Sequence, residues 1–138
     1  TMLAEGPFGS YDFWLVCLSQ DSAEIKSLTI TEQAGNLRSN FSKGDVVTFN
    51  FTIENTGTND LSQALVSIEI IDPNNIVQLI SYSIINLKAA TSKEMITGDR
   101  VPLDACKGAY TVKVMIFTNW PSQGGVGLDI KTGIFNVG

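Results

Sequence analysis

Residues 46–54 read Val-Val-Thr-Phe-Asn-Phe-Thr-Ile-Glu, and this stretch decides the fold. Its apolar side chains alternate with polar ones and fall at Val47, Phe49, Phe51 and Ile53. A period of two is typical of a β-strand with one face in a core and the other in water. The turn-forming residues Asn, Thr, Gly and Asp follow at 55–60. The stretch therefore predicts a half-buried strand that ends in a turn.

Six further stretches either show the same alternation or are apolar throughout. They are residues 25–31, 66–70, 76–85, 92–97, 110–117 and 128–137. Residues 76–85 are apolar on both faces, as in a strand under cover. In residues 110–117, alternate side chains from Tyr110 to Ile116 are expected to face the core. Gly133 is expected to mark a bulge. Seven strands separated by turns predict an all-β, immunoglobulin-like β-sandwich.

The composition limits the setting of this sandwich. A chain of 138 residues is the usual size of one domain. A net charge of −5 and a pI near 4.5 argue against nucleic acid or an anionic membrane as partner. The longest apolar run, residues 13–18, is far shorter than the ~20 residues of a membrane-spanning helix. We expect an extracellular or cell-surface protein whose signal peptide has been removed, with no membrane span in the mature chain.

Three local motifs carry a resemblance to a known group. Lys-Gly-Asp-Val-Val at 43–47 leads into a strand that ends Ile-Glu-Asn-Thr-Gly at 53–57. Ile-Ile-Asn-Leu occupies 84–87, and Gly-Ala-Tyr-Thr-Val-Lys-Val occupies 108–114. This succession resembles the extracellular immunoglobulin-like domains of the CARDB type, found in bacteria and archaea. It is also similar to sandwich domains of archaeal surface appendages. The resemblance covers residues 25–137 and implies a sandwich fold and a cell-surface role.

Tyr110 stands where the tyrosine of a tyrosine corner would stand, although a half-buried aromatic in a strand explains it equally well. Val112 occupies the place of the second core cysteine of antibody domains. The chain is therefore not an antibody-type domain.

Catalytic chemistry has little support in the sequence. The chain contains no histidine, which removes the commonest general base and most zinc sites. Carboxylates gather at strand ends, at Asp45, Glu54, Asp60, Asp72, Asp99 and Asp104. They could hold calcium at loops, but capping of turns by aspartate is the simpler interpretation. We expect no enzyme activity, no cofactor and no metal site.

Two loop features and two kinds of modification remain open. Trp120-Pro121 either contacts a sugar or a partner or packs against the end of the sandwich, and the glycines of 124–127 indicate a hairpin loop. Cys17 and Cys106 form a disulfide, within one chain or between two, or stay as thiols. Asn40 and Asn50 lie in glycosylation sequons.

The N-terminal part is more apolar than the sandwich requires. Residues 11–18 predict an eighth strand, which divides the chain into an arm at 1–24 and a sandwich at 25–138. Its apolar side chains cover both faces and are Phe13, Trp14, Leu15, Val16, Cys17 and Leu18. Buried together they are worth about 10 kcal/mol, comparable with the stability of a whole domain. This strand therefore needs a partner.

The predicted strand at residues 11–18 has two possible partners. The strand either joins its own sandwich or completes that of a neighbouring copy by donor-strand complementation, which yields a filament. The first expectation is thus a structural subunit of an extracellular, pilus-like filament made of copies of itself. The alternative is a non-filamentous adhesion or envelope-anchoring module that contacts other surface proteins or glycans.

Overall fold

The computed structural model describes residues 21–138 and contains eight β-strands. They are β1 (Ala23–Thr31), β2 (Asn40–Phe41), β3 (Val46–Asn55), β4 (Leu61–Ile71), β5 (Val77–Leu87), β6 (Ser92–Arg100), β7 (Gly108–Phe117) and β8 (Gly127–Val137). A single 3₁₀ turn, η1 (Pro121–Gln123), lies between β7 and β8. All seven strands predicted in this part of the chain are present. The addition is β2, whose two residues are too few to give a periodic signal.

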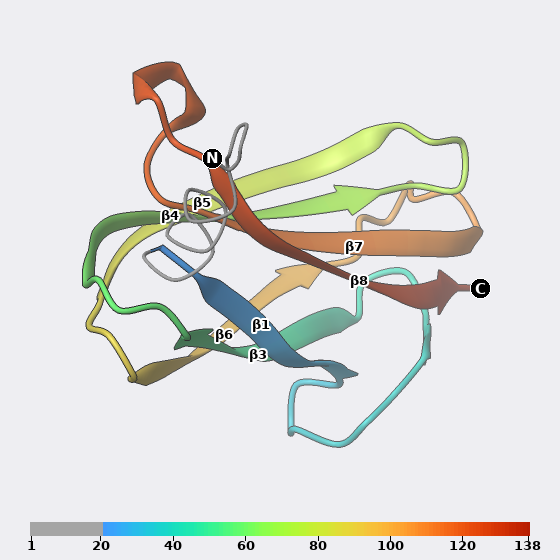
Figure 1. Cartoon of the computed structure of the whole chain (residues 1–138). Helices are drawn as coiled ribbons and strands as arrows, with labels where there is room; N and C mark the ends of the chain where they lie inside the picture. Colours follow the sequence, from blue (N-terminus) through green and yellow to red (C-terminus); the bar gives the residue numbers. More distant parts are fainter. Residues whose placement is uncertain (1–20) are drawn as a thin grey trace, which may run out of the picture.

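The strands form two layers (Figure 1). One sheet has three strands in the order β1-β3-β6, and the other has five in the order β2-β8-β7-β4-β5. All pairs are antiparallel except β2 with β8. The prediction of an all-β, immunoglobulin-like sandwich is confirmed for the described residues.

The core lies between the two sheets. The four apolar positions of β3 that alternate in the sequence are each at most 2% exposed, and those of β7 are each at most 5% exposed. Phe135 of β8 joins the aromatic side chains at one end of this core, stacking on Tyr110 at 5.4 Å and meeting Phe41 edge-on at 5.9 Å. Burial of a large apolar side chain contributes about 1.5–3 kcal/mol, so β3 and β7 are major contributors to the stability of the sandwich.

Two sequence predictions about strand detail are wrong. Gly133 pairs directly with Val112, and the irregularity in the β7–β8 ladder lies between Ile116 and Phe117 instead. A Cβ at Gly133 would meet the side chains of Ile30 and Val112 at 3.3 and 3.4 Å, so the glycine permits close packing of β1 on β8. The second error concerns β5, which is an edge strand and mostly exposed.

Candidate assembly surface

Strand β5 is the border of the five-stranded sheet. Among the described strands it pairs only with β4, so its second row of backbone groups has no strand beside it. Cross-strand partners share a face of a sheet. Ser81 and Ser83 face inward because they stand opposite Ile68 and Val66 of the core. The intervening side chains of β5 therefore face outward.

Those outward side chains are large and apolar. Ile80, Tyr82 and Ile84 are 49%, 57% and 46% exposed. The same outer face continues to the far side of the sheet, where Ile130 and Ile134 of β8 are also more than half exposed. Between these two groups of apolar side chains, the outward positions of β4 and β7 include Glu69 and Lys113. We call the outward side chains of β5 and β8 the apolar outer face.

The loop between β7 and β8 extends this face. The indole ring of Trp120 meets the Tyr82 ring edge-on, with 5.2 Å between ring centroids. A Cβ at Gly125 would overlap the backbone carbonyl of Asn119, so the tight loop requires glycine there. Trp120 is still 37% exposed, so it both packs on β5 and remains accessible to a partner.

Ser67 of β4 is directed to the outer side of the same sheet, directly opposite Tyr82 of β5 and Met115 of β7. Its Oγ atom is buried and, within residues 21–138, is the one buried side-chain oxygen or nitrogen that lacks a hydrogen-bond partner. A buried polar group without a hydrogen-bond partner lowers the stability of the fold.

The outer face of the three-stranded sheet is different. The outward residues of β3 are Thr48, Asn50, Thr52 and Glu54. Glu54 also forms an ion pair with Lys26, in which the lysine Nζ atom donates a hydrogen bond to the carboxylate at 2.6 Å. This hydrogen bond raises the pKa of Lys26 above its ordinary value. The β3 part of this face is therefore polar, whereas Ile96 of β6, opposite Asn50, is 65% exposed.

Two grooves open on the side of the sandwich between β5 and β6. One has a volume of about 130 Å³ and reaches Phe51 and Val66, and the other has about 160 Å³ and reaches Phe49 and Ile68. Both are bordered by β5 and β6, through Ser81 and Thr97. This side of the molecule is therefore hollowed between the two sheets, although Phe49, Phe51 and Val66 remain buried beneath it.

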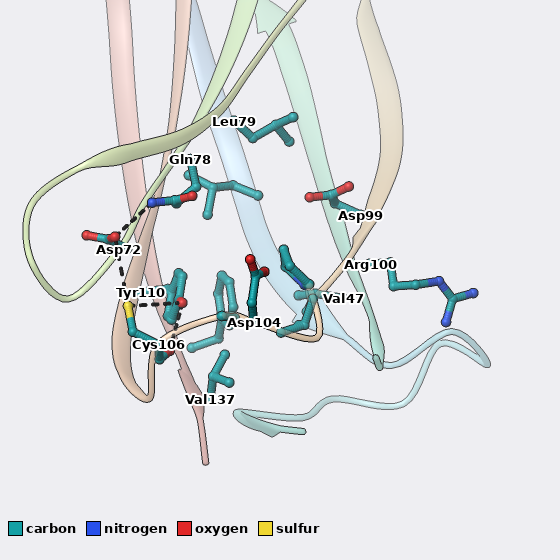
Figure 2. Close-up of a pocket in the computed structure, with 15 residues that line it drawn as sticks. Val47, Asp72, Gln78, Leu79, Asp99, Arg100, Asp104, Cys106, Tyr110 and Val137 are labelled. Atoms are coloured by element: carbon teal, nitrogen blue, oxygen red, sulfur yellow. Dashed lines mark hydrogen bonds between the residues drawn. The ribbon is translucent and has the colours of Figure 1, made fainter. Parts of the chain in front are cut away.

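A third and larger hollow, of about 280 Å³, lies at the end of the sandwich where β4 turns into β5 (Figure 2). Asp72 caps that turn, because its carboxylate accepts hydrogen bonds from the backbone N–H groups of Asn74 and Ile76, each at 2.9 Å, and from Gln78 at 2.8 Å. These bonds, the one from Ile76 first, hold the pKa of Asp72 below its ordinary value. Gln78 thereby fixes the start of β5.

Cys106 borders the same hollow and is a half-buried free thiol. The Tyr110 hydroxyl donates a hydrogen bond to the carbonyl oxygen of Cys106 at 2.8 Å, four residues upstream. This is the geometry of a tyrosine corner, one of the two readings that the sequence allowed. Burial, more than the neighbouring thiol, raises the pKa of Tyr110 to about 12, so the hydroxyl keeps its proton and remains a donor at neutral pH.

The other predicted site residues have separate positions. Residues 13–18, with Cys17, lie outside the described residues, so the disulfide with Cys106 stays a prediction. Asn40 is exposed at the start of β2, and Asn50 is half-buried on the outward face of β3. Glycosylation of either one also stays a prediction.

The carboxylates at strand ends act on turns. Asp45 accepts a hydrogen bond from the backbone N–H of Ser42 at 2.8 Å, and Asp60 accepts one from Ala89 at 2.9 Å. Within residues 21–138, no three such side chains gather as they would around a metal ion. Capping is therefore the observed role of Asp45, Asp60 and Asp72.

Comparison with known proteins supports the fold. Neither a protein-family model nor a curated protein matches the sequence. Among solved structures, the C-terminal domain of wzt is similar at a TM-score of 0.71 and 15% identity, over 87% of this chain and 75% of that one. A CARDB domain from Pyrococcus furiosus, solved in solution, is similar at a TM-score of 0.60 and 12% identity, over 86% of this chain and 96% of that one.

A crystal structure of that CARDB domain, in complex with di-metal ions, is similar at a TM-score of 0.56 and 12% identity, over 87% of this chain and 92% of that one. Identities this low show a shared fold alone. The resemblance to CARDB-type sandwiches is therefore supported as a resemblance of architecture, and the chain is an immunoglobulin-like β-sandwich similar to those domains.

Proposed function

We propose that the chain is a structural subunit of an extracellular surface filament, in which the N-terminal strand of one copy completes the sandwich of the next. The observation that carries this proposal is the open edge of β5. From Val77 to Leu87 the strand has no charged residue, no proline and no glycine. Natural proteins protect exposed edges with such residues, because a bare apolar edge pairs with other chains.

Residues 13–18 supply the complementary half of the contact. They are apolar on both faces, and β5 offers apolar surface both on its outer face and in the grooves beside it. A contact between two different surfaces of one chain repeats without closing on itself and builds a filament.

An extracellular location is part of the proposal. CARDB-type sandwiches, which this fold resembles, are extracellular domains, and the sequence carries two sequons. Within residues 21–138 no helix is long and apolar enough to cross a bilayer. We also propose a role without catalysis, which the lack of histidine in the sequence supports.

A second candidate is a non-filamentous adhesion or envelope-anchoring module. The exposed aromatic pair of Trp120 and Tyr82 favours it, because aromatic side chains at the surface anchor contacts with proteins and glycans. In this case the apolar outer face would contact a different surface molecule instead of a second copy.

The experiment that separates the two candidates measures mass against concentration by light scattering, for the full chain and for its Leu15→Glu variant. The filament proposal expects the mass of the parent chain to rise with concentration and that of L15E to remain monomeric, since a buried carboxylate opposes the strand contact. A Ser10→Glu change outside the apolar segment is the control and should assemble like the parent. A parent chain that remains monomeric throughout would leave only the second candidate.

A further inference from the structure

We infer that the free edge of β5 is the acceptor for residues 13–18 of a second copy, and that the added strand runs antiparallel to β5. This inference rests on the proposed function, because it names the site and the direction of the contact proposed there. It follows from three features of the described structure: the surfaces on either side of β5, the place where the chain enters the sandwich, and the direction of the other strands.

The surfaces beside β5 suit a strand that is apolar on both faces. A strand added at this edge would turn alternate side chains outward, next to Ile80, Tyr82 and Ile84. Its other side chains would turn inward, over the groove that reaches Phe51 and Val66. Six apolar residues in residues 13–18 can thus be covered on both sides at this place.

The point of entry into the sandwich is fixed. The carbonyl oxygen of Ser22 accepts hydrogen bonds from the backbone N–H groups of Thr56 and Gly57, at 3.0 and 3.1 Å. Asn55, next to Thr56, donates to the carbonyl oxygen of Leu87 at 2.9 Å. Ser22 therefore lies at the Leu87 end of β5, and residues 13–18 of the same chain must approach this end with their C-terminal residue.

This entry point decides which strand directions a chain can reach on its own β5. Four residue steps separate Leu18 from Ser22 and span at most about 14 Å. In antiparallel pairing, residue 13 would lie at the Leu87 end of β5, and residue 18 would lie five residues farther along, about 17 Å from that end. The tether of four residue steps between Leu18 and Ser22 is too short to cover this distance. A chain can place its own segment on β5 only in the parallel direction.

Antiparallel pairing is the more stable kind, and the ladders of β1, β3, β4, β5, β6, β7 and β8 with one another are all antiparallel. The one parallel pair joins only two residues of β2 to β8. Because the tether forbids the favoured direction within one chain, a second copy is the source that can provide it.

The direction also fixes where Cys17 arrives. In the antiparallel arrangement Cys17 comes toward the Val77 end of β5, where Gln78 and Leu79 border the same hollow as Cys106. In the parallel arrangement it comes toward the Leu87 end, at the opposite end of the strand. The position of Cys17 on β5 therefore distinguishes the two directions.

Two engineered cysteines test this directly. Ile80→Cys and Ile84→Cys are matched changes, since both side chains face outward from β5 and are exposed to nearly the same degree. Each is made in the full chain with Cys106→Ser, so that the introduced cysteine is the only thiol besides Cys17. Oxidised glutathione serves as oxidant: the two thiols join with loss of two protons and two electrons, and the glutathione disulfide is reduced to two thiols. Non-reducing gels and light scattering are read in parallel.

The expected result is a covalent ladder that forms about tenfold or more faster with I80C than with I84C, because only the former holds the two thiols at high effective concentration. A ladder that prefers I84C, or a bond of I84C within a single chain, would overturn the antiparallel, intermolecular arrangement. Assembly by light scattering with no cross-link at either site would overturn β5 as acceptor and leave the filament proposal standing. Absence of both assembly and cross-links would overturn both proposals together.

Discussion

The two strands on the open side of the sandwich, β5 and β6, are neighbours in the chain and each borders its own sheet. Strand β6 carries four charges among its nine residues, at Lys93, Glu94, Asp99 and Arg100, and a glycine at position 98. Strand β5 carries none in eleven. The two edges therefore differ in composition, although each borders its sheet and both line the same two grooves.

Charged residues on an edge strand prevent the approach of another strand, because pairing would remove their charges from water. Strand β6 therefore has the composition of an edge strand that is protected against pairing with another strand. Strand β5 has the composition of an interior strand, and this is why the sequence pattern predicts it to be covered. Strand β5 is thus mostly exposed in the single chain although its composition is that of a covered strand.

The largest effect is expected from the core residues beneath the groove that β5 and β6 both border. Phe51 of β3 is fully buried beneath the groove, whereas Met95 of β6, directly opposite, is only partly buried. Phe51→Ala should lower the free energy of unfolding by about 3–5 kcal/mol. Met95→Ala should cost clearly less, since its site is already partly open to water. Urea unfolding measures both, and equal losses would show that β6 closes the core as firmly as β3 does.

A lysine substituted into each edge strand tests separately whether β5 and β6 contribute to assembly. Ile80→Lys on β5 should weaken assembly by about 3 kcal/mol, roughly a hundredfold in the association constant, since the contact would bury a charge. Glu94→Lys on β6 is the control, because Glu94 is also exposed on an edge strand but borders neither groove. Sedimentation at several concentrations measures both, and comparable losses would mean that the two edges contribute alike.

The smallest effect concerns pH and the turn that starts β5. The pKa of Asp72 is depressed below its ordinary 3.8, so its contribution to stability is complete well above that value. The contribution fades as the pH falls through 3.8 toward the depressed pKa. Asp72→Asn should flatten this acid limb of the stability profile and leave β6 unaffected. Thermal melts between neutral and acidic pH provide the measurement, and a parallel acid limb in the variant would contradict the assignment.

The sequence predicts much of this sandwich, for physical reasons that differ between elements. The alternation in β3 and β7 is complete, and every inward position is buried. The error at Gly133 arose because a glycine in a strand has two meanings, a bulge or a close approach, and only the packed neighbours Ile30 and Val112 decide between them. Sequence cannot supply that contact.

The sequence predicted the apolar character of the candidate surface but not the position of β5 at the border of its sheet. Residues 13–18 attract attention by their apolarity, and β5 by the same property, but nothing in the pattern shows that β5 is at a border. The strand order of a sheet depends on contacts between distant segments, and the pairing of β4 with both β5 and β7 is such a contact. The contact of Trp120 with Tyr82 was undetermined for the same reason.

The contact between Trp120 and Tyr82 provides an intrinsic fluorescence probe of the β5 edge. The chain has two tryptophans, one at position 14 and one at position 120, and the second is held 5.2 Å from Tyr82 on the edge strand. An indole that is still partly in water shifts its emission when a neighbouring chain excludes that water. Fluorescence of Trp120, read in a Trp14→Phe background, therefore follows the occupancy of β5 in solution without any added dye.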